Sequence, residues 1–279
     1  MRIVEAALIT ETVKRLCIDA NRMLPEDVRE RIRECRLSET WPGAQDTLDK
    51  IISNFELAEK GQLPICQDTG MACVFLEIGT GVYIRGDVNE AVHEGVRRAY
   101  REGYFRSSVV ADPLGRKNTG DNTPAMIYVE FVPGDKLAVT VAPKGFGSEN
   151  MSRTKMLSPS DGIEAVIDFV VSAVDEAGPN PCPPIVVGVG LGGTFDKAAL
   201  LAKKALLRPL GNHHGDPYYA ELEKTLLEKI NALGIGPQGF GGATTALAVA
   251  VETMPTHIAG LPCAVNINCH VSRHIREEL

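Results

Sequence analysis

The feature that most constrains the fold is the segment PPIVVGVGLGGTFDKAALLAKKALL, which spans residues 183–207. It begins with a continuous apolar run, continues through a Gly-Gly-Thr sequence, and ends with apolar residues at helical spacing. This order predicts a buried strand, a glycine turn and a helix. The segment therefore indicates a fold that mixes strands and helices.

The rest of the chain shows the same mixture. Helices are expected around 4–23, 25–38 and 44–60, which form a helical N-terminal part of about residues 1–62, and again near 88–103, 161–178 and 217–234. Strands are expected near 72–78, 244–253 and 263–270. AMIYVEFV and KLAVTVAP, joined by Pro133-Gly134-Asp135, predict an antiparallel hairpin. We expect a mixed α/β (α+β) fold with interspersed strands and helices after the N-terminal helices.

Composition narrows the class of protein. The chain has 279 residues, of which 44% are hydrophobic, and a formal charge of −7. That charge argues against binding to nucleic acid or an anionic membrane. No apolar run reaches the length of a membrane span. The seven cysteines form no CxxC pair and are odd in number, which fits a reducing cytoplasm in which some thiols are metal ligands.

Four irregular segments carry most of the reactive side chains, as loops on a scaffold often do. They are 63–73, 104–124, 142–152 and 255–274. In the first, Cys66-Gln67-Asp68-Thr69-Gly70 gathers a thiol, an amide, a carboxylate and a hydroxyl in one turn. Such a turn could hold a metal and a substrate together. It could equally be a turn whose side chains bond their own backbone, with Cys66 as a small buried hydrophobe.

Two further cysteines stand at the ends of expected strands. Cys182 lies between prolines in Asn-Pro-Cys-Pro-Pro, which fix the backbone before a strand. A rigid backbone of this kind suits a metal ligand, and it also suits a segment that only leads into a strand. Cys269 follows an apolar strand among polar residues, and taken alone it is ambiguous too.

Together these segments resemble the α part of class I fumarases and L(+)-tartrate dehydratases, over nearly the whole chain. The motifs that carry the resemblance are CQDTG, RSSVVADPLGRKNTGDNTPA, KGFGSEN, NPCPP, GVGLGGTFDKAALLAKKALLR and GIGPQGFGG. The resemblance implies one cluster-binding α subunit over residues 1–279. It implies reversible hydration of fumarate to malate, a step of the tricarboxylic acid cycle, with L(+)-tartrate dehydration as the alternative.

In that family three cysteines hold a [4Fe-4S] cluster, and the motifs put these ligands on Cys66, Cys182 and Cys269. A cubane with three thiolates has one iron without a cysteine ligand, which can act as a Lewis acid. Cys263 is the rival for the third position. The other cysteines, Cys17, Cys35 and Cys73, are expected to be packing residues or to open a strand.

The resemblance also implies a pocket for a small dicarboxylate. Arg106 would clamp a carboxylate through two parallel hydrogen bonds. The catalytic residues implied are Asp68, Arg106 and His257. The substrate-binding residues implied are Gln67, Asp68, Arg106, Gly145, Gly147 and His257, with Gly145 and Gly147 bending backbone amides towards an anion. Because the chain stops at Leu279, where single-chain relatives continue, we expect a separate β subunit and an α2β2 assembly.

Three other interpretations stay open. Gly188, Gly190 and Gly193 match the GxGxxG pattern of dinucleotide-binding enzymes, although no strand ending in an acidic residue follows at the required distance. Cys269, His270 and His274 could bind zinc. The chain could also be a noncatalytic subunit that supports a partner.

Overall fold

The computed structural model describes all 279 residues, which form two compact units. Unit 1 contains Met1–Pro25, Phe55–Phe146 and Arg273–Leu279, and unit 2 contains Glu26–Asn54 and Gly147–Ser272. In sequence, α3 (Pro42–Gly61) and the short α5 (Phe146–Glu149) span the boundaries between them. Each unit has its own buried core. No helix combines the length and the apolar composition needed to cross a lipid bilayer.

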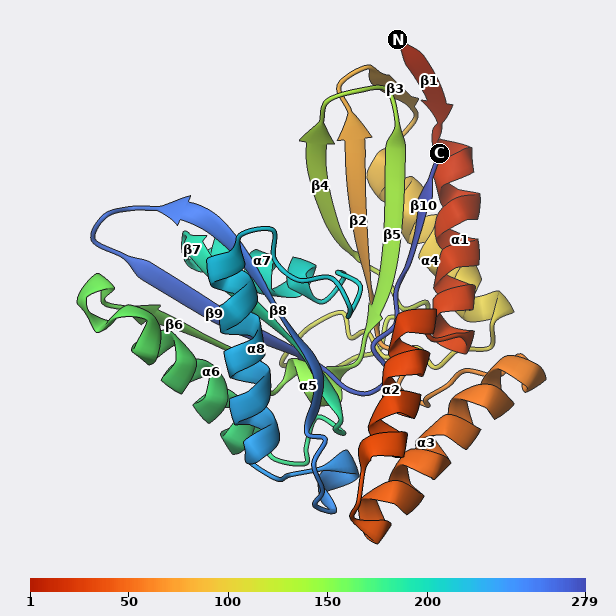
Figure 1. Cartoon of the computed structure of the whole chain (residues 1–279). Helices are drawn as coiled ribbons and strands as arrows, with labels where there is room; N and C mark the ends of the chain where they lie inside the picture. The colour runs from red at the N-terminus through yellow and green to blue at the C-terminus, as the bar shows by residue number, and fades with distance from the viewer. The chain divides into compact units, whose positions relative to one another are not determined.

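Unit 1 is a four-stranded sheet with two long helices (Figure 1). Its elements are β1 (Arg2–Glu5), α1 (Ala6–Arg22), β2 (Met71–Gly79), β3 (Val82–Arg85), α4 (Val88–Glu102), β4 (Met126–Val132), β5 (Leu137–Lys144) and β10 (Ile275–Glu278). The strand order is β10-β5-β2-β4, and β1 pairs with β3 in a separate ribbon. Apolar residues of α1 and α4 form one core with those of β2 and β5. Asp87 begins α4 by accepting the N–H of Glu90 at 3.0 Å.

The hairpin expected between β4 and β5 does not form. β2 lies between these strands, parallel to β4 and antiparallel to β5. The antiparallel pairing that the sequence predicted is therefore present, but with a different partner. The physical reason is that β2 is buried along nearly all of its length, so it needs a strand on each side, whereas β4 is largely exposed and suits an edge.

Unit 2 is a sheet with helices on both faces. Its elements are α2 (Glu26–Ser38), β6 (Arg153–Leu157), α6 (Gly162–Ala177), β7 (Ile185–Gly193), α7 (Phe195–Ala205), α8 (Pro217–Ala232), β8 (Ala246–Thr256), β9 (Leu261–Asn268) and two short 3₁₀ turns, Pro159–Asp161 and Pro237–Gly239. The strand order is β6-β9-β7-β8, with β7 parallel to β8 and antiparallel to β9. Apolar residues of α6 and α8 share a core with alternate residues of β7.

The other face of β7 meets α7 across two glycines. A Cβ at Gly188 would lie 2.1 Å from the carbonyl oxygen of Ala202, and one at Gly190 would lie 2.0 Å from that of Ala198. These glycines are needed so that the helix can approach the strand. They lie inside β7 and not in a loop after it. The GxGxxG pattern thus has a packing role here, which removes the main support for a dinucleotide site.

Four short strands were not expected from the sequence. They are β1, β3, β6 and β10, of four or five residues each. Apart from these strands, the short α5 and the two 3₁₀ turns, the helices and strands lie near the expected positions, and the fold is mixed α/β with helices at the N-terminus, as predicted.

Candidate functional site

Residues 66–70, which we call the Cys66–Gly70 turn, lead directly into β2. Cys66 and Asp68 are half-buried, and Gln67 is exposed. Gly70 has a φ of +74°, and a Cβ there would lie 2.8 Å from the backbone of Lys144 in β5. Only glycine fits where the turn enters the sheet.

Asp68 is the centre of the polar contacts of this turn. Its Oδ1 accepts the N–H of Gly70 at 3.1 Å and forms an ion pair with Nη2 of Arg106 at 3.2 Å. Its Oδ2 accepts the backbone N–H of Phe146 at 3.0 Å. Its own N–H donates to Sγ of Cys66 at 3.4 Å. The structure therefore brings Cys66, Asp68 and Arg106 together in unit 1.

Hydrogen bonds hold both the backbone and the side chain of Arg106, yet its guanidinium keeps donors for a ligand. Its carbonyl oxygen accepts the hydroxyl of Thr69 at 2.9 Å, and its Nε donates to Oγ of Ser108 at 3.1 Å. The side chain remains 53% exposed. A guanidinium has five donors, so N–H groups remain that can bind a carboxylate.

The loop after β5 does not form the amide nest that Gly145 and Gly147 led us to expect. Neither glycine has a positive φ, and residues Phe146–Glu149 instead form the short α5. The N–H of Phe146 is used by the carboxylate of Asp68. A Cβ at Gly145 would lie 3.2 Å from Oδ2 of that carboxylate, so the small residue leaves room for Asp68.

Three buried side chains hold the carbonyl groups of the turn. Arg273 donates from Nη2 to the oxygen of Asp68. The hydroxyl of Tyr100 lies 2.5 Å from the oxygen of Thr69, and Nδ2 of Asn122 donates to that of Gly70 at 3.1 Å. Burial raises the pKa of Tyr100 well above its usual value, so its hydroxyl remains a donor at neutral pH.

Sequence reasoning did not single out these three residues. Arg273 and Asn122 stand within segments that we had selected, but Tyr100 lies in α4, outside all four of them. Their donors come from separate parts of the chain, so no local pattern announces them. The sequence signal that could have identified them is a polar side chain between apolar residues. The same pattern occurs on ordinary amphipathic helices, so it does not point to a site.

In unit 2, two other cysteines begin and end adjacent strands. Cys182 stands just before β7, is exposed, and has a φ of +56°, a left-handed conformation that is costly for a residue with a side chain. Its carbonyl oxygen accepts the N–H of His270 at 3.3 Å. Cys269 follows β9 and is half-buried. Because Val186 pairs with Asn268, Cys182 and Cys269 lie at the same end of the sheet.

His257 lies at the other end of that sheet. It follows Thr256, which pairs with Gly193 at the end of β7, and it is exposed. The strand from Val186 to Gly193 corresponds to roughly 23 Å at about 3.3 Å per residue. Within unit 2 the structure therefore separates His257 from Cys182 and Cys269.

Comparison with known proteins gives a consistent picture. The sequence profile of the fumarate hydratase (Fumerase) family matches residues 10–278. The chain belongs to the fumarate hydratase family. It is therefore a hydro-lyase, an enzyme that adds or removes water.

Two relatives cover nearly the same length. A putative L(+)-tartrate dehydratase subunit alpha of Methanocaldococcus jannaschii is 46% identical over 273 residues, which are 95% of this chain and 95% of that protein. The L(+)-tartrate dehydratase subunit alpha of Escherichia coli strain K12 is 31% identical over 268 residues, which are 95% of this chain and 88% of that protein.

The cysteines of this fumarate hydratase family member fall into two groups by exposure. Burial raises the pKa of Cys17 and of Cys263 to about 12, and it also raises the pKa of Cys35, so these thiols stay protonated at neutral pH. Cys73 is buried within β2. Cys66, Cys182 and Cys269 are the members of the set that are half-buried or exposed. Their accessibility fits thiolate ligands better than that of Cys263, the rival third ligand.

The candidate metal ligands are divided between the units. Cys66 belongs to unit 1, whereas Cys182 and Cys269 belong to unit 2. The alternative zinc set is divided too, because His274 belongs to unit 1 and His270 to unit 2. Within either unit taken by itself, no three His, Cys, Asp or Glu side chains are grouped so as to hold a metal ion.

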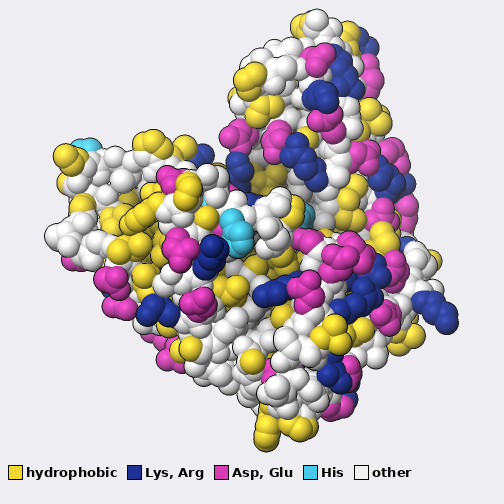
Figure 2. Space-filling view, in the orientation of Figure 1, with side chains coloured by type: hydrophobic (Ala, Val, Ile, Leu, Met, Phe, Trp, Pro, Cys, Tyr) yellow, Lys and Arg dark blue, Asp and Glu magenta, His cyan; other side chains and the backbone are white.

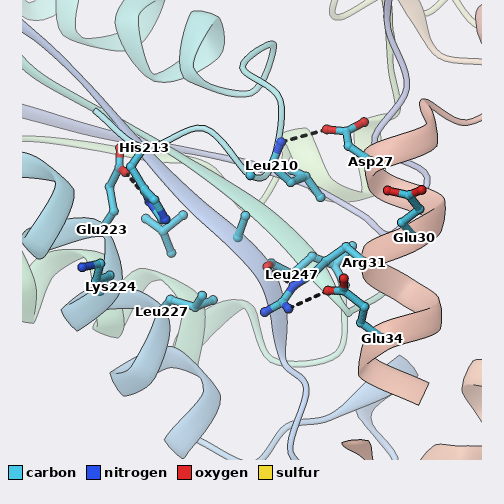
Figure 3. Close-up of a pocket in the computed structure, with 13 residues that line it drawn as sticks. Asp27, Glu30, Arg31, Glu34, Leu210, His213, Glu223, Lys224, Leu227 and Leu247 are labelled. Atoms are coloured by element: carbon cyan, nitrogen blue, oxygen red, sulfur yellow. Dashed lines mark hydrogen bonds and ion pairs between the residues drawn. The ribbon is translucent and has the colours of Figure 1, made fainter. Parts of the chain in front are cut away.

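A separate cavity in unit 2 of this hydro-lyase has the wrong charge for a dicarboxylate. It has a volume of about 420 Å³ and lies between α2, α8 and β8 (Figure 3). Its carboxylates outnumber its cations: Asp27, Glu30, Glu34 and Glu223 line it together with Arg31 and Lys224. A dianion would be repelled there. The turn around Asp68, with its exposed Arg106, is the better candidate for the substrate.

Proposed function

We propose that this chain is the α subunit of a [4Fe-4S]-dependent hydro-lyase that acts on a four-carbon hydroxydicarboxylate. The observation that carries the proposal is that Cys66 and Asp68 share one turn of unit 1 and that Arg106 is paired with Asp68 there. A thiol, a fixed carboxylate and a guanidinium with donors to spare are the groups that such a reaction needs. Membership of the fumarate hydratase family supports the reaction class.

We propose that Cys66, Cys182 and Cys269 hold the cluster. The donor set fits, since these three thiols are accessible and cysteine thiolates are the usual ligands of iron–sulfur clusters. When bound, a cluster with one iron lacking a cysteine ligand supplies a Lewis acid for the hydroxyl and a carboxylate of the substrate. Acquisition of iron by the metal-free chain tests this part without any assay of turnover.

The protein's own residues would bind and orient the acid. Arg106 would hold one carboxylate through its remaining N–H groups while Asp68 keeps the guanidinium in place. Asp68 in turn is held by the N–H groups of Gly70 and Phe146, so its carboxylate has a fixed direction. From that position it would orient the hydroxyl of the substrate or accept a proton.

We propose L(+)-tartrate as the first substrate to test, with malate and fumarate beside it. The sequence alone favoured fumarate, but two relatives that match nearly the whole chain carry the tartrate dehydratase name. Tartrate and malate, the two hydroxy acids, differ by one hydroxyl, which a few hydrogen bonds in the pocket can distinguish.

We propose that the working enzyme contains a separate β subunit, in an α2β2 assembly in the cytoplasm. The relatives are named as alpha subunits, which supports a partner of another kind. His257 is separated from Cys182 and Cys269 by the length of β7. If His257 contacts the same substrate, it must therefore come from a second copy of the chain.

The test is coexpression with the neighbouring β chain, anaerobic reconstitution with iron and sulfide, and an absorbance assay on L(+)-tartrate, malate and fumarate. Arg106→Lys is the informative variant, because it keeps the charge but loses the planar fork. We expect KM to rise by about tenfold or more with loss of one charge-assisted hydrogen bond. Arg101→Lys, an exposed arginine at the end of α4, is the matched control.

Two results would contradict the proposal. One is a reconstituted assembly that binds iron and sulfide but turns over none of the three acids. The other is full activity of the metal-free assembly after prolonged exposure to air and chelator. Zinc in place of iron would favour the zinc interpretation, and neither metal would favour a supporting subunit.

A further inference from the structure

A buried arginine without a carboxylate partner lies against the Cys66–Gly70 turn. Arg273 is 4% exposed, and its Nη2 donates to the carbonyl oxygen of Asp68. Its Nε and Nη1 are buried and have no hydrogen-bond partner. Burying a guanidinium without a counter-charge is unfavourable. A positive charge kept in such a place indicates a task other than ordinary packing.

Two ionisable side chains, Cys17 and Tyr100, lie within electrostatic range of Arg273. Burial raises the pKa of both, although the positive charge of Arg273 acts in the opposite direction. Both are therefore uncharged at neutral pH. The positive charge of Arg273 is not neutralised by either of them, so it can act on the backbone and ligands of the turn.

An arginine close by in the sequence shows what a purely structural role looks like. Arg276, in β10, is half-exposed and donates from Nη1 and Nη2 to both carboxylate oxygens of Glu77, at 3.0 and 2.9 Å. Arg273 forms no such fork. Its one bond goes to the residue that carries the proposed catalytic carboxylate.

We propose that Arg273 is a positioning residue for the proposed hydro-lyase site, on which this inference rests. By holding the carbonyl group of Asp68, it fixes the backbone from which two functional groups project. One is the Asp68 carboxylate, and the other is the thiol of Cys66, which accepts the N–H of Asp68 at 3.4 Å. Its positive charge, which is paired with no carboxylate, also favours the binding of an acid at the turn.

The test compares Arg273→Met with Arg273→Lys and with the control Arg276→Met. Methionine fills much of the volume without a donor or a charge, whereas lysine keeps both. In the metal-free full-length chain, hydrogen exchange of the peptide that covers residues 63–73 should become faster by about tenfold or more in Arg273→Met, as loss of a charge-assisted bond implies. Lysine should restore most of the protection, and Arg276→Met should leave it unchanged.

Turnover supplies the second measurement. In the reconstituted assembly, Arg273→Met should lower kcat by about tenfold or more with little change in KM, because the substrate's own contact with Arg106 is intact. Arg273→Lys should recover most of kcat. If Arg273→Met shows no cooperative melting, Arg273→Gln replaces it in the same comparison with lysine.

The inference is overturned if the folded methionine or glutamine variant keeps wild-type exchange in residues 63–73. It is also overturned if lysine is no better than the neutral variant, since packing alone would then explain the residue. The exchange measurement needs no turnover. Suppose that Arg273→Met loosens the turn but the wild-type assembly shows no turnover. The positioning role of Arg273 would then stand, and the proposed function would be contradicted.

Discussion

The backbone N–H of Phe146 donates to Oδ2 of Asp68 at 3.0 Å, so the start of α5 is bonded directly to the turn before β2. The same carboxylate accepts the N–H of Gly70 and pairs with Arg106 through its other oxygen. Asp68 thus links three segments of unit 1. This linkage makes its substitution informative.

Asp68→Asn should leave the side-chain volume unchanged but remove the charge and one acceptor. An amide cannot accept from Phe146, Gly70 and Arg106 as a carboxylate does, so Arg106 should lose its fixed position. We expect kcat/KM for the hydroxydicarboxylate to fall by about 100- to 10,000-fold. Steady-state kinetics measures this, with Asp112→Asn, in the exposed loop after α4, as the control. Near wild-type kcat/KM in Asp68→Asn would rule out a catalytic role.

Cys269→Ser should lower the iron content, whereas Cys263→Ser should lower the stability of the fold. The first should lose most of the reconstituted iron while its melting temperature without metal stays near wild type. The second places a hydroxyl in the core, where Cys263 is fully buried, and should cost about 1–3 kcal/mol of stability while iron is retained. Iron and sulfide analysis with thermal melting distinguishes them. Iron retained in Cys269→Ser but lost in a folded Cys263→Ser would exchange their roles.

Glu223→Gln should destabilise unit 2. Glu223 is 1% exposed and is bonded to Arg208, to His213 and to the N–H of Val251. Without this carboxylate, Arg208 would keep only Glu252 as a charged partner, so we expect a loss of about 1–3 kcal/mol. Glu221→Gln on the same helix changes only an exposed pair and should cost at most about 1 kcal/mol. Denaturant unfolding is the measurement, and equal midpoints for the two variants would contradict it.

Glu39 should make the stability of unit 2 fall in acid. Burial alone would raise its pKa, but the N–H groups of Trp41, Ala243 and Thr40 outweigh burial and hold the pKa below the usual 4.5. A carboxyl whose pKa is lowered by folding stabilises the fold above the unfolded pKa. That contribution is therefore present above pH 4.5 and lost as pH falls through the folded value. Urea unfolding across this range should show a flatter pH dependence in Glu39→Gln, and parallel curves would refute it.

Gly190→Ala should test the packing of α7 on β7. The added Cβ would meet the carbonyl oxygen of Ala198 at 2.0 Å, so strand and helix must separate. We expect a loss of about 1–3 kcal/mol from overpacking. Gly211→Ala, where a Cβ would meet nothing within 4 Å, is the control.

Calorimetric titration with NAD and NADP should give no binding to the wild type, and tight binding that Gly190→Ala abolishes would restore the dinucleotide interpretation.

The sequence predicted the long elements because their periodicity is strong. The helices α4, α6 and α8 and the strand β7 lie close to their expected limits. β10 was missed because four residues, Ile275–Glu278, are too few to show alternation, and β4 was given the wrong partner because a turn motif does not reveal that β2 enters between two strands. Strand partners are a property of the whole sheet.

The candidate site shows a similar division. Asp68 and Arg106 were selected from motifs, whereas Tyr100 and Arg273 were not, because the value of a buried donor depends on which carbonyl group it meets. Gly145 and Gly147 were expected to curl the backbone around an anion. Glycine permits that conformation but does not impose it, and the chain there forms a helical turn instead.

The pairing of β10 with β5 also has a consequence for how the protein is made. β10 is an edge of the unit 1 sheet, yet all of residues 147–272, which belong to unit 2, precede it in the chain. During synthesis, the edge of the unit 1 sheet beside β5 stays open until residues 275–278 have emerged from the ribosome. Arg273 emerges just before β10, so the Cys66–Gly70 turn acquires its buried cation only after residues 147–272 have been made.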